Sequence, residues 1–195
     1  VNIMPVTQRD VPIVVNEVGR LAPNREVVLS AQVSGIVRTY SVDMGTFATA
    51  DMMLVTLDQR DYRLALNESR ANLLAARARY TAALNSYNRA EQLLPENVVT
   101  QEYFDKIEAD YKAAQAAVSQ AQAVVDINQR RLEKTAIGAP FDGLVTRRMV
   151  ELGQNINIGD PVIAMADMAL MRVKIYVNEQ DYVHVDKDDA VSIVV

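Results

Sequence analysis

The chain has 195 residues, of which 50% are hydrophobic and 23% are charged, and this length allows one or two small domains with real cores. The formal net charge of −5 and the absence of a basic cluster argue against nucleic-acid binding. Cysteine is absent, which excludes disulfide and thiolate chemistry, and no apolar run reaches the roughly 18 residues that a membrane-spanning helix needs.

The composition changes twice along the chain. Residues 1–58 are rich in valine and contain glycine, proline and alternating apolar positions. Residues 59–134 contain one proline and no glycine, and consist mainly of Ala, Gln, Arg, Leu and Glu. Residues 135–195 return to valine, isoleucine, glycine and proline. The outer segments therefore predict strands and turns, and the middle segment predicts helix.

The two outer segments repeat each other at an offset of 108 residues. The identical pairs are Ala31 and Ala139, Gly35 and Gly143, Val37 and Val145, Val42 and Val150, and Gly45 and Gly153. Six further positions match conservatively, which indicates a duplicated β-unit. Each half is too small to bury a core alone, so we expect the two halves to pack as a sandwich.

The repeated glycines suggest two kinds of backbone constraint. Gly35 and Gly143 each precede a run that contains valine, where we expect a close backbone approach or a sharp bend. Gly45 and Gly153 are expected in turns that need a positive φ angle.

The middle segment carries two heptad seams, with large residues every seven positions and mostly small residues three positions after them. The large positions are Leu66, Leu73, Tyr80, Tyr87 and Leu94 in the first seam, and Phe104, Tyr111, Val118, Val125 and Leu132 in the second. One chain reversal near Val99 brings all five pairs face to face, from Leu94 with Phe104 to Leu66 with Leu132. The pattern therefore predicts an antiparallel coiled-coil hairpin.

The predicted reversal has suitable turn chemistry. Pro95 cannot continue a helix interior, and Thr100 is a suitable N-cap for the returning helix. Arms of about 35 residues give a rod of roughly 50 Å at ~1.5 Å per residue. The alternative is a hairpin inside a larger helical bundle. That arrangement needs a second apolar stripe, whereas the outward faces are mostly polar, so a projecting rod is favoured.

Two β half-motifs interrupted by a coiled-coil hairpin resemble the membrane fusion proteins, or periplasmic adaptors, of the hemolysin-secretion D-type (HlyD) superfamily. The matching stretches are residues 33–37, 42–45 and 54–58 in the first half, and residues 139–145, 153–154 and 159–162 in the second. This chain departs from the family pattern at Asp51, which stands where Gly159 stands in the second half.

The resemblance implies an α+β fold, with the long hairpin inserted between the halves of a lipoyl-like sandwich. The expected boundaries are 28–58 with 135–167 for the lipoyl-like domain, 59–134 for the hairpin, and 1–27 with 168–195 for part of a β-barrel. Strands of that barrel are expected at Val11–Val18, Leu170–Val177 and Ala190–Val195. Because the chain stops at Val195, we expect the barrel to be incomplete.

Arg89, Leu93 and Thr100 have the spacing of a motif at the hairpin tip of the family. They resemble the residues with which adaptors of resistance-nodulation-division (RND) pumps engage a TolC-like outer-membrane channel, with threonine in the place of the usual serine. Arg89 and Leu93 lie one helical turn apart on the same face. The simpler interpretation is a solvated arginine, a leucine beside the seam and an N-cap threonine.

The resemblance implies a non-catalytic efflux adaptor in the periplasm of a Gram-negative bacterium. Its partners would be an inner-membrane RND transporter and a TolC-like outer-membrane channel. It would self-associate into a ring, expected to be a hexamer, and be anchored to the inner membrane by a segment outside this chain. An adaptor of an ABC-type exporter or of a type I secretion system is the first alternative.

A lipoyl or biotinyl carrier domain is a second alternative. Such carriers bear a modified lysine between their two halves, but this chain has the helical insertion at that position and no lysine before residue 98.

Enzymatic and metal-binding functions have little support in the sequence. His184 is the only histidine, so no second His or Cys exists to complete a metal site with it. The eight methionines could serve a soft metal ion, but their apolar surroundings favour core packing. No Ser/His/Asp arrangement, phosphate-binding loop or carboxylate pair is recognisable, so we expect neither catalysis nor a cofactor.

Overall fold

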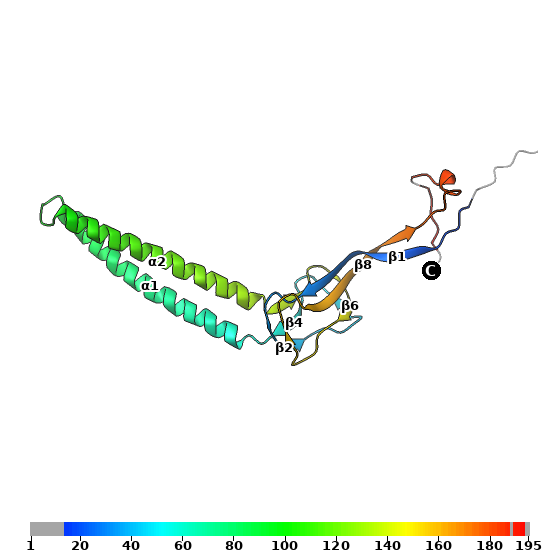
Figure 1. Ribbon diagram of the computed structural model, residues 1–195, viewed down its shortest axis with the longest axis horizontal. Helices are drawn as coiled ribbons and strands as arrows, with labels where there is room; N and C mark the ends of the chain where they lie inside the picture. Colours follow the sequence, from blue (N-terminus) through cyan, green and yellow to red (C-terminus); the bar gives the residue numbers. More distant parts are fainter. Residues whose placement is uncertain (1–13, 188, 194–195) are drawn as a thin grey trace, which may run out of the picture. The chain divides into compact units, whose positions relative to one another are not determined.

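The computed structural model describes residues 14–187 and 189–193, with the elements labelled in Figure 1. The chain divides into two compact units. The larger unit is Glu26–Asp167, and the smaller is made from Val1–Arg25 and Met168–Val195. The larger unit holds the hairpin and the sandwich, and the two are described in turn.

Helices α1 (Arg60–Leu93) and α2 (Gln101–Glu133) form the predicted antiparallel hairpin and lie side by side in Figure 1. Every predicted seam position is buried or half-buried. Leu66, Leu73 and Val125 form an apolar cluster, with Val118, Ala121 and Leu132 packed against it. Neither of these two described helices has a stretch apolar enough to cross a membrane.

Aromatic rings fill the seam in the half of the hairpin nearer its turn. Tyr87 stacks on Tyr111 with ring centroids 5.1 Å apart, as the reversal near Val99 requires. Each of these rings also contacts the next layer, because Tyr87 lies 5.6 Å from Phe104 and Tyr80 lies 5.6 Å from Tyr111. Rings that alternate between layers in this way fix the register of the two helices.

The sandwich consists of two four-stranded sheets, each built from both halves of the repeat. One sheet has the order β1-β8-β6-β3, and the other has the order β5-β4-β2-β7. The strands are β1 (Gly19–Ser30), β2 (Gly35–Tyr40), β3 (Phe47–Ala48), β4 (Met53–Leu57), β5 (Ala136–Gly138), β6 (Gly143–Arg148), β7 (Asn155–Ile156) and β8 (Pro161–Ile175).

The repeat detected in the sequence is also a repeat of strand pairing. Gly35 of β2 pairs with Ile156 of β7, and the equivalent Gly143 of β6 pairs with Ala48 of β3. The core combines the halves in the same way, and its fully buried residues include Val37, Leu54, Val145, Val162 and Met165. Neither half could exclude water from these side chains alone, as the sequence predicted.

Arg148 joins the two halves on the sandwich surface. Its guanidinium lies 4.2 Å from the centre of the Tyr40 ring, the residue that occupies the equivalent position in the first half. It also forms ion pairs with Asp43 at 3.3 Å and Glu151 at 2.9 Å, which are likewise equivalent to each other. One side chain therefore links corresponding turns of both halves.

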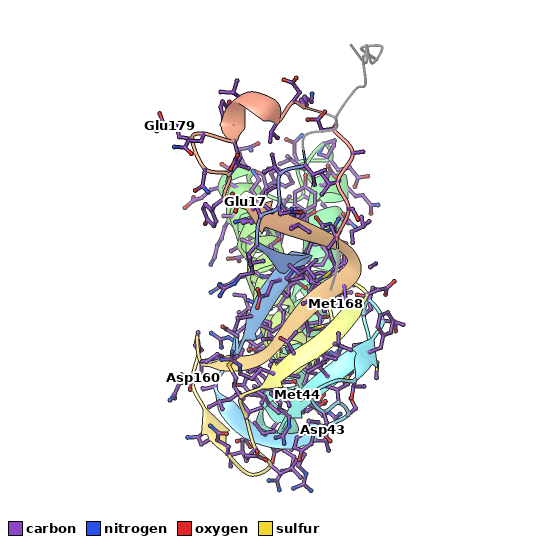
Figure 2. The ribbon with its side chains drawn as sticks, turned by 90° about the vertical axis from the view of Figure 1, so that its right-hand side faces the viewer. Glu17, Asp43, Met44, Asp160, Met168 and Glu179 are labelled. Carbon is purple, nitrogen blue, oxygen red and sulfur yellow. The ribbon has the colours of Figure 1, made fainter. Side chains whose placement is uncertain are left out.

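Four tight turns of the sandwich are related by the repeat, at residues 43–46, 49–52, 151–154 and 157–160. Met44 and Asp160, labelled in Figure 2, belong to the first and the last of them. The third residue of each turn has a positive φ: 86° at Gly45, 61° at Asp51, 78° at Gly153 and 93° at Gly159. Only Asp51 carries a side chain in this left-handed conformation, which favours glycine.

We expect Asp51→Gly to raise the free energy of unfolding by about 0.5 kcal/mol, because removal of the strained Cβ outweighs the added freedom of the unfolded chain. The change does not affect the backbone hydrogen bond that Asp51 N donates to Ala139 O at 2.8 Å. The reciprocal variant Gly159→Asp should lower stability by a similar amount, since open space surrounds a Cβ at Gly159 and only its φ is unfavourable. Calorimetry of both variants would measure the two effects. A shift of both in the same direction would contradict this explanation.

The hairpin is attached to the sandwich by side-chain hydrogen bonds at its base. The Tyr62 hydroxyl donates to Ser34 O at 2.7 Å, and its ring packs against the sandwich core. Gln59 Nε2 donates to Thr135 Oγ1 at 2.8 Å, which ties together the two points where the chain enters and leaves the hairpin. Beside them, hydrogen bonds from the Arg60 side chain lower the pKa of Asp58 to about 2.

The strands expected at the ends of the chain differ from the prediction. Residues 11–13 lie outside the described part, residues 14–18 form no strand, and β1 begins at Gly19, where the predicted strand was to end. Val14 and Val18 are exposed. Valine-rich residues form a strand only where a neighbouring strand can pair with them, and residues 14–18 pair with no strand in the described chain.

In the C-terminal segment, one expected strand is present for most of its length and the other is absent from the described residues. The strand expected at residues 170–177 is the end of β8, which begins at Pro161 in the sandwich and ends at Ile175. Residues 190–193 form no strand, and residues 194–195 lie outside the described part. A short 3₁₀ helix, Tyr182–His184, precedes them.

Candidate docking site at the hairpin tip

A Schellman motif ends α1 and begins the reversal of the chain. Val98 N donates to Leu93 O at 3.2 Å, and Asn97 N donates to Leu94 O at 3.1 Å. Asn97 has a φ of 56°, a conformation that asparagine tolerates better than most residues. This pair of hydrogen bonds places Val98 beside Leu93 and fixes the shape of the tip.

Thr100 is the N-cap of α2, as the sequence predicted. Its Oγ1 accepts a hydrogen bond from Tyr103 N at 3.2 Å, and its backbone is extended, with φ −79° and ψ 155°. The hydroxyl oxygen is therefore used as an acceptor within the protein. Its proton remains free to donate outward, because the side chain is exposed.

Arg89 is exposed on α1, and its orientation is set by a neighbour on the same helix. Arg89 Nη2 donates to Ser86 Oγ at 3.2 Å. Ser86 Oγ in turn donates to Ala82 O at 3.1 Å. Leu93, one turn further along, is 37% exposed, whereas Leu94 next to it is half-buried in the seam. Leu93 therefore points away from the seam and is available to a partner.

The three residues singled out from the sequence line one shallow groove of about 450 Å³. Ser86, Val98 and Tyr103 line the same groove, and sequence reasoning did not select them. The missed signal was helical spacing, since Ser86 precedes Arg89 by three residues and Tyr103 follows Thr100 by three. The groove combines an arginine, the hydroxyls of Ser86, Thr100 and Tyr103, and an apolar floor, which suits protein recognition better than chemistry.

Two phenols in the seam below the tip, those of Tyr87 and Tyr111, have raised pKa values. Partial burial, followed by the nearby Glu91 carboxylate, raises the pKa of Tyr87, and the Tyr87 hydroxyl donates to Glu91 Oε1 at 3.2 Å. A hydrogen bond with Tyr80 is the main cause of the raised pKa of Tyr111. Because both pKa values lie above the usual value for tyrosine, neither phenol adds a negative charge near the tip.

The four glycines that the repeat shares between its halves have different roles. Gly45 and Gly153 adopt the positive φ described above. A Cβ at Gly143 would lie 2.7 Å from Ala166 O, so the backbones approach closely there. A Cβ at Gly35 would meet Leu57 at 3.5 Å, an ordinary contact. A close backbone approach, one of the two constraints expected at these positions, is therefore present at Gly143 and not at Gly35.

The methionines form the packed core that was expected of them only in part. Met165 is buried and Met52 packs against the core, but Met44, Met53, Met168 and Met171 are 73%, 53%, 47% and 41% exposed. Apolar sequence neighbours did not predict burial, because Met44 lies in a turn and the strands that hold the other three also have side chains that face solvent. Within the described residues, no group of three or more His, Cys, Asp or Glu side chains could hold a metal ion.

The hairpin inserted into a duplicated sandwich is the architecture of a known family. Residues 25–167 match the family described as RND MFP, barrel-sandwich hybrid domain, where MFP denotes membrane fusion protein. The chain belongs to the membrane fusion protein family. This membership is consistent with the resemblance found in the sequence, and it accounts for both the sandwich and its helical insertion.

Individual relatives of this membrane fusion protein include two export components. It is 29% identical to the macrolide export protein MacA of Escherichia coli O157:H7, over 85% of this chain and 49% of MacA. It is 27% identical to the multidrug efflux pump subunit AcrA of Escherichia coli K12, over 72% of this chain and 36% of AcrA. Across the most similar relatives, the chain spans about half of their length.

Solved structures show the same fold. MacA from Actinobacillus actinomycetemcomitans matches with a TM-score of 0.61 and 25% identity, over 85% of this membrane fusion protein and 56% of that chain. A MacA-MexA chimeric protein, which contains the Pseudomonas aeruginosa MexA α-hairpin domain, matches with a TM-score of 0.54 and 26% identity, over 88% of this chain and 59% of that one.

Proposed function

We propose that this chain is the periplasmic adaptor of a tripartite efflux pump in a Gram-negative bacterium. It bridges an inner-membrane RND transporter and a TolC-like outer-membrane channel. The observation that carries the proposal is the groove at the turn of the hairpin, because Arg89, Leu93 and Thr100 line it together. A docking site at the end of a rod of roughly 50 Å can reach a partner that the sandwich cannot contact.

The proposed mechanism is geometric and does not involve catalysis or a cofactor. The hairpin extends from the sandwich within one compact unit (Figure 1) and presents its turn to the channel. Copies of the chain associate as a ring, taken as a hexamer, which surrounds a conduit. The smaller unit, together with parts of the protein outside this chain, contacts the transporter, which supplies the energy.

An adaptor of an ABC-type exporter is the second candidate. The comparisons do not favour one pump type, since the identity to the macrolide export protein MacA is 29% and the identity to the multidrug efflux pump subunit AcrA is 27%. A type I secretion adaptor is a weaker candidate, because arms of 34 and 33 residues are short for a rod of that class.

In-cell photo-crosslinking distinguishes these candidates. A photoreactive residue is placed at Val98 on the tip, which is 63% exposed, or at Val18 in the smaller unit, which is 91% exposed, in the full-length protein of its native host. We expect Val98 to capture an outer-membrane channel and Val18 to capture an RND transporter. An ABC transporter captured from Val18 would select the second candidate.

The matched control for this experiment is Leu74 on the same rod, which is 71% exposed and distant in sequence from the tip. A photoreactive residue at Leu74 should capture no channel. Equal capture of the channel from Leu74 and Val98 would contradict docking by the tip.

A further inference from the structure

The groove at the hairpin tip has an apolar side that the three-residue motif does not contain. We propose that Tyr103 is a fourth docking residue, and that the groove takes an aliphatic side chain flanked by main-chain carbonyl oxygens at a helix end or turn of the channel. This inference rests on the proposed function and specifies the partner chemistry of that site.

The polar side of the groove offers donors. The Arg89 guanidinium is held in place by Ser86 and keeps further N–H groups free. Thr100 Oγ1 accepts from Tyr103 N, and its hydroxyl proton is free to donate to an outside partner. Among the described residues that line the groove, Arg89 is the one charged side chain. A complementary surface must therefore present oxygen acceptors, which the last carbonyl groups of a helix leave unpaired.

The apolar side is formed by three exposed side chains on different parts of the turn. Leu93 at the end of α1 is 37% exposed, Val98 in the turn is 63% exposed, and Tyr103 in the first turn of α2 is 51% exposed. The Schellman motif fixes the backbones of Leu93 and Val98 relative to each other. The Thr100 cap fixes the start of the helix that carries Tyr103. This preformed apolar floor matches an aliphatic side chain of the partner.

Tyr103 has the properties of a residue that contributes strongly to binding. An aromatic ring offers a large contact area with few rotatable bonds, and tyrosine and arginine are enriched among the residues that dominate interface affinity. The rings that pack in the seam are those of Tyr80, Tyr87, Phe104 and Tyr111. The exposed Tyr103 ring is placed for contact with a partner.

Substitution of Tyr103 separates binding from folding. Tyr103→Ala removes the ring but keeps the backbone N–H that Thr100 accepts, so the cap of α2 remains. Binding of the purified full-length adaptor to the purified TolC-like channel of its own host is measured by biolayer interferometry. We expect Tyr103→Ala to weaken binding about tenfold, in keeping with loss of a central interface side chain. Tyr103→Phe should retain most of the affinity, and Leu74→Ala on the middle of the rod should match the unsubstituted protein.

Charged variants at the same position test the acceptor chemistry. Tyr103→Asp places a carboxylate near the partner's carbonyl oxygens, whereas Tyr103→Lys places a cation there. We expect the aspartate variant to bind at least tenfold more weakly than the lysine variant. Equal binding of the two, or stronger binding of the aspartate variant, would overturn the proposed partner chemistry.

The outcomes also separate this inference from the proposed function. If Arg89→Ala abolishes channel binding but Tyr103→Ala does not weaken it, the tip docks without Tyr103 and the inference is wrong. If neither variant weakens binding, the proposed function of the tip fails as well. A Tyr103→Phe variant as weak as Tyr103→Ala would assign the effect to the hydroxyl and refute an apolar contact.

Discussion

Arg89→Ala is expected to weaken channel binding roughly thirtyfold while leaving the melting temperature unchanged. The Arg89 side chain is exposed and donates a hydrogen bond to Ser86 on its own helix. Alanine is a good helix former, so stability should change by less than about 0.5 kcal/mol. Loss of a charged donor at the centre of an interface costs about 2 kcal/mol or more. In cells, the variant should raise sensitivity to the pump's substrates.

Arg77 provides the matched control for this variant. It lies on the same helix and donates to Gln122 Oε1 at 3.2 Å across the hairpin, away from the tip. Arg77→Ala removes the same charge from the rod and should leave channel binding within about twofold of normal. Full binding and export by Arg89→Ala, or equal loss in both variants, would rule out a specific role for Arg89.

Gly143→Ala should lower the free energy of unfolding by about 2 kcal/mol. The new Cβ would lie 2.7 Å from Ala166 O, and also 3.2 Å from Phe141 Cε2. Ala166 belongs to β8 and pairs with Leu144 beside the substituted position, so the clash is with the backbone of a neighbouring strand. A sheet can relieve it only by shifting β6 from β8, and such overpacking costs about 1–3 kcal/mol.

The internal repeat supplies the control, because Gly35 is equivalent to Gly143. A Cβ at Gly35 would meet Leu57 Cβ at 3.5 Å, which is an ordinary contact. Gly35→Ala should therefore change stability by less than about 0.5 kcal/mol or raise it slightly, since alanine has less freedom than glycine in the unfolded chain. Calorimetry of the two variants measures the difference. Equal destabilisation would mean that the close contact with Ala166 is not the cause.

The hairpin was predictable from the sequence because its signal is local and repeated. Each layer of the seam carries the same information, and the two seams match only for one turn position, so Tyr87 could be placed opposite Tyr111. The duplicated sandwich was predictable for a similar reason, because the same residue pattern occurs in both halves and the equivalent strands of the two halves pair in the same way. A fold can be predicted from one sequence when several parts of the sequence carry the same pattern.

Features that depend on a single contact could not be predicted. Gly35 and Gly143 occupy equivalent positions in the sequence, but only the latter faces a carbonyl oxygen at close range. Residues 14–18 are rich in valine, which favours strands, but pairing is a property of the neighbouring chain and not of the segment itself. Arg148 contacts Tyr40 across the repeat, and no local pattern marks that pair.

Only part of the tip groove could be predicted. The spacing of Arg89, Leu93 and Thr100 was informative because a helix face and a cap fix where such residues lie. Tyr103 and Val98 join them through the Schellman motif and the N-cap, which are set by backbone hydrogen bonds. The shape of the groove therefore follows from the turn geometry, which sequence alone did not provide.

The hydrogen bond between Gln59 and Thr135 at the base of the hairpin has a consequence for the order of folding. Strands β4 and β5 pair with each other although the whole hairpin separates them in sequence, as in the partners Met53 and Gly138. Closing a flexible loop of that length costs roughly 4 kcal/mol of chain entropy. Helices that form first and associate from the turn toward the base bring the two strands together through short-range steps. The folded hairpin then holds β4 and β5 close together while the sandwich assembles. The effective contact order of the protein is therefore far lower than the sequence separation of its paired strands implies.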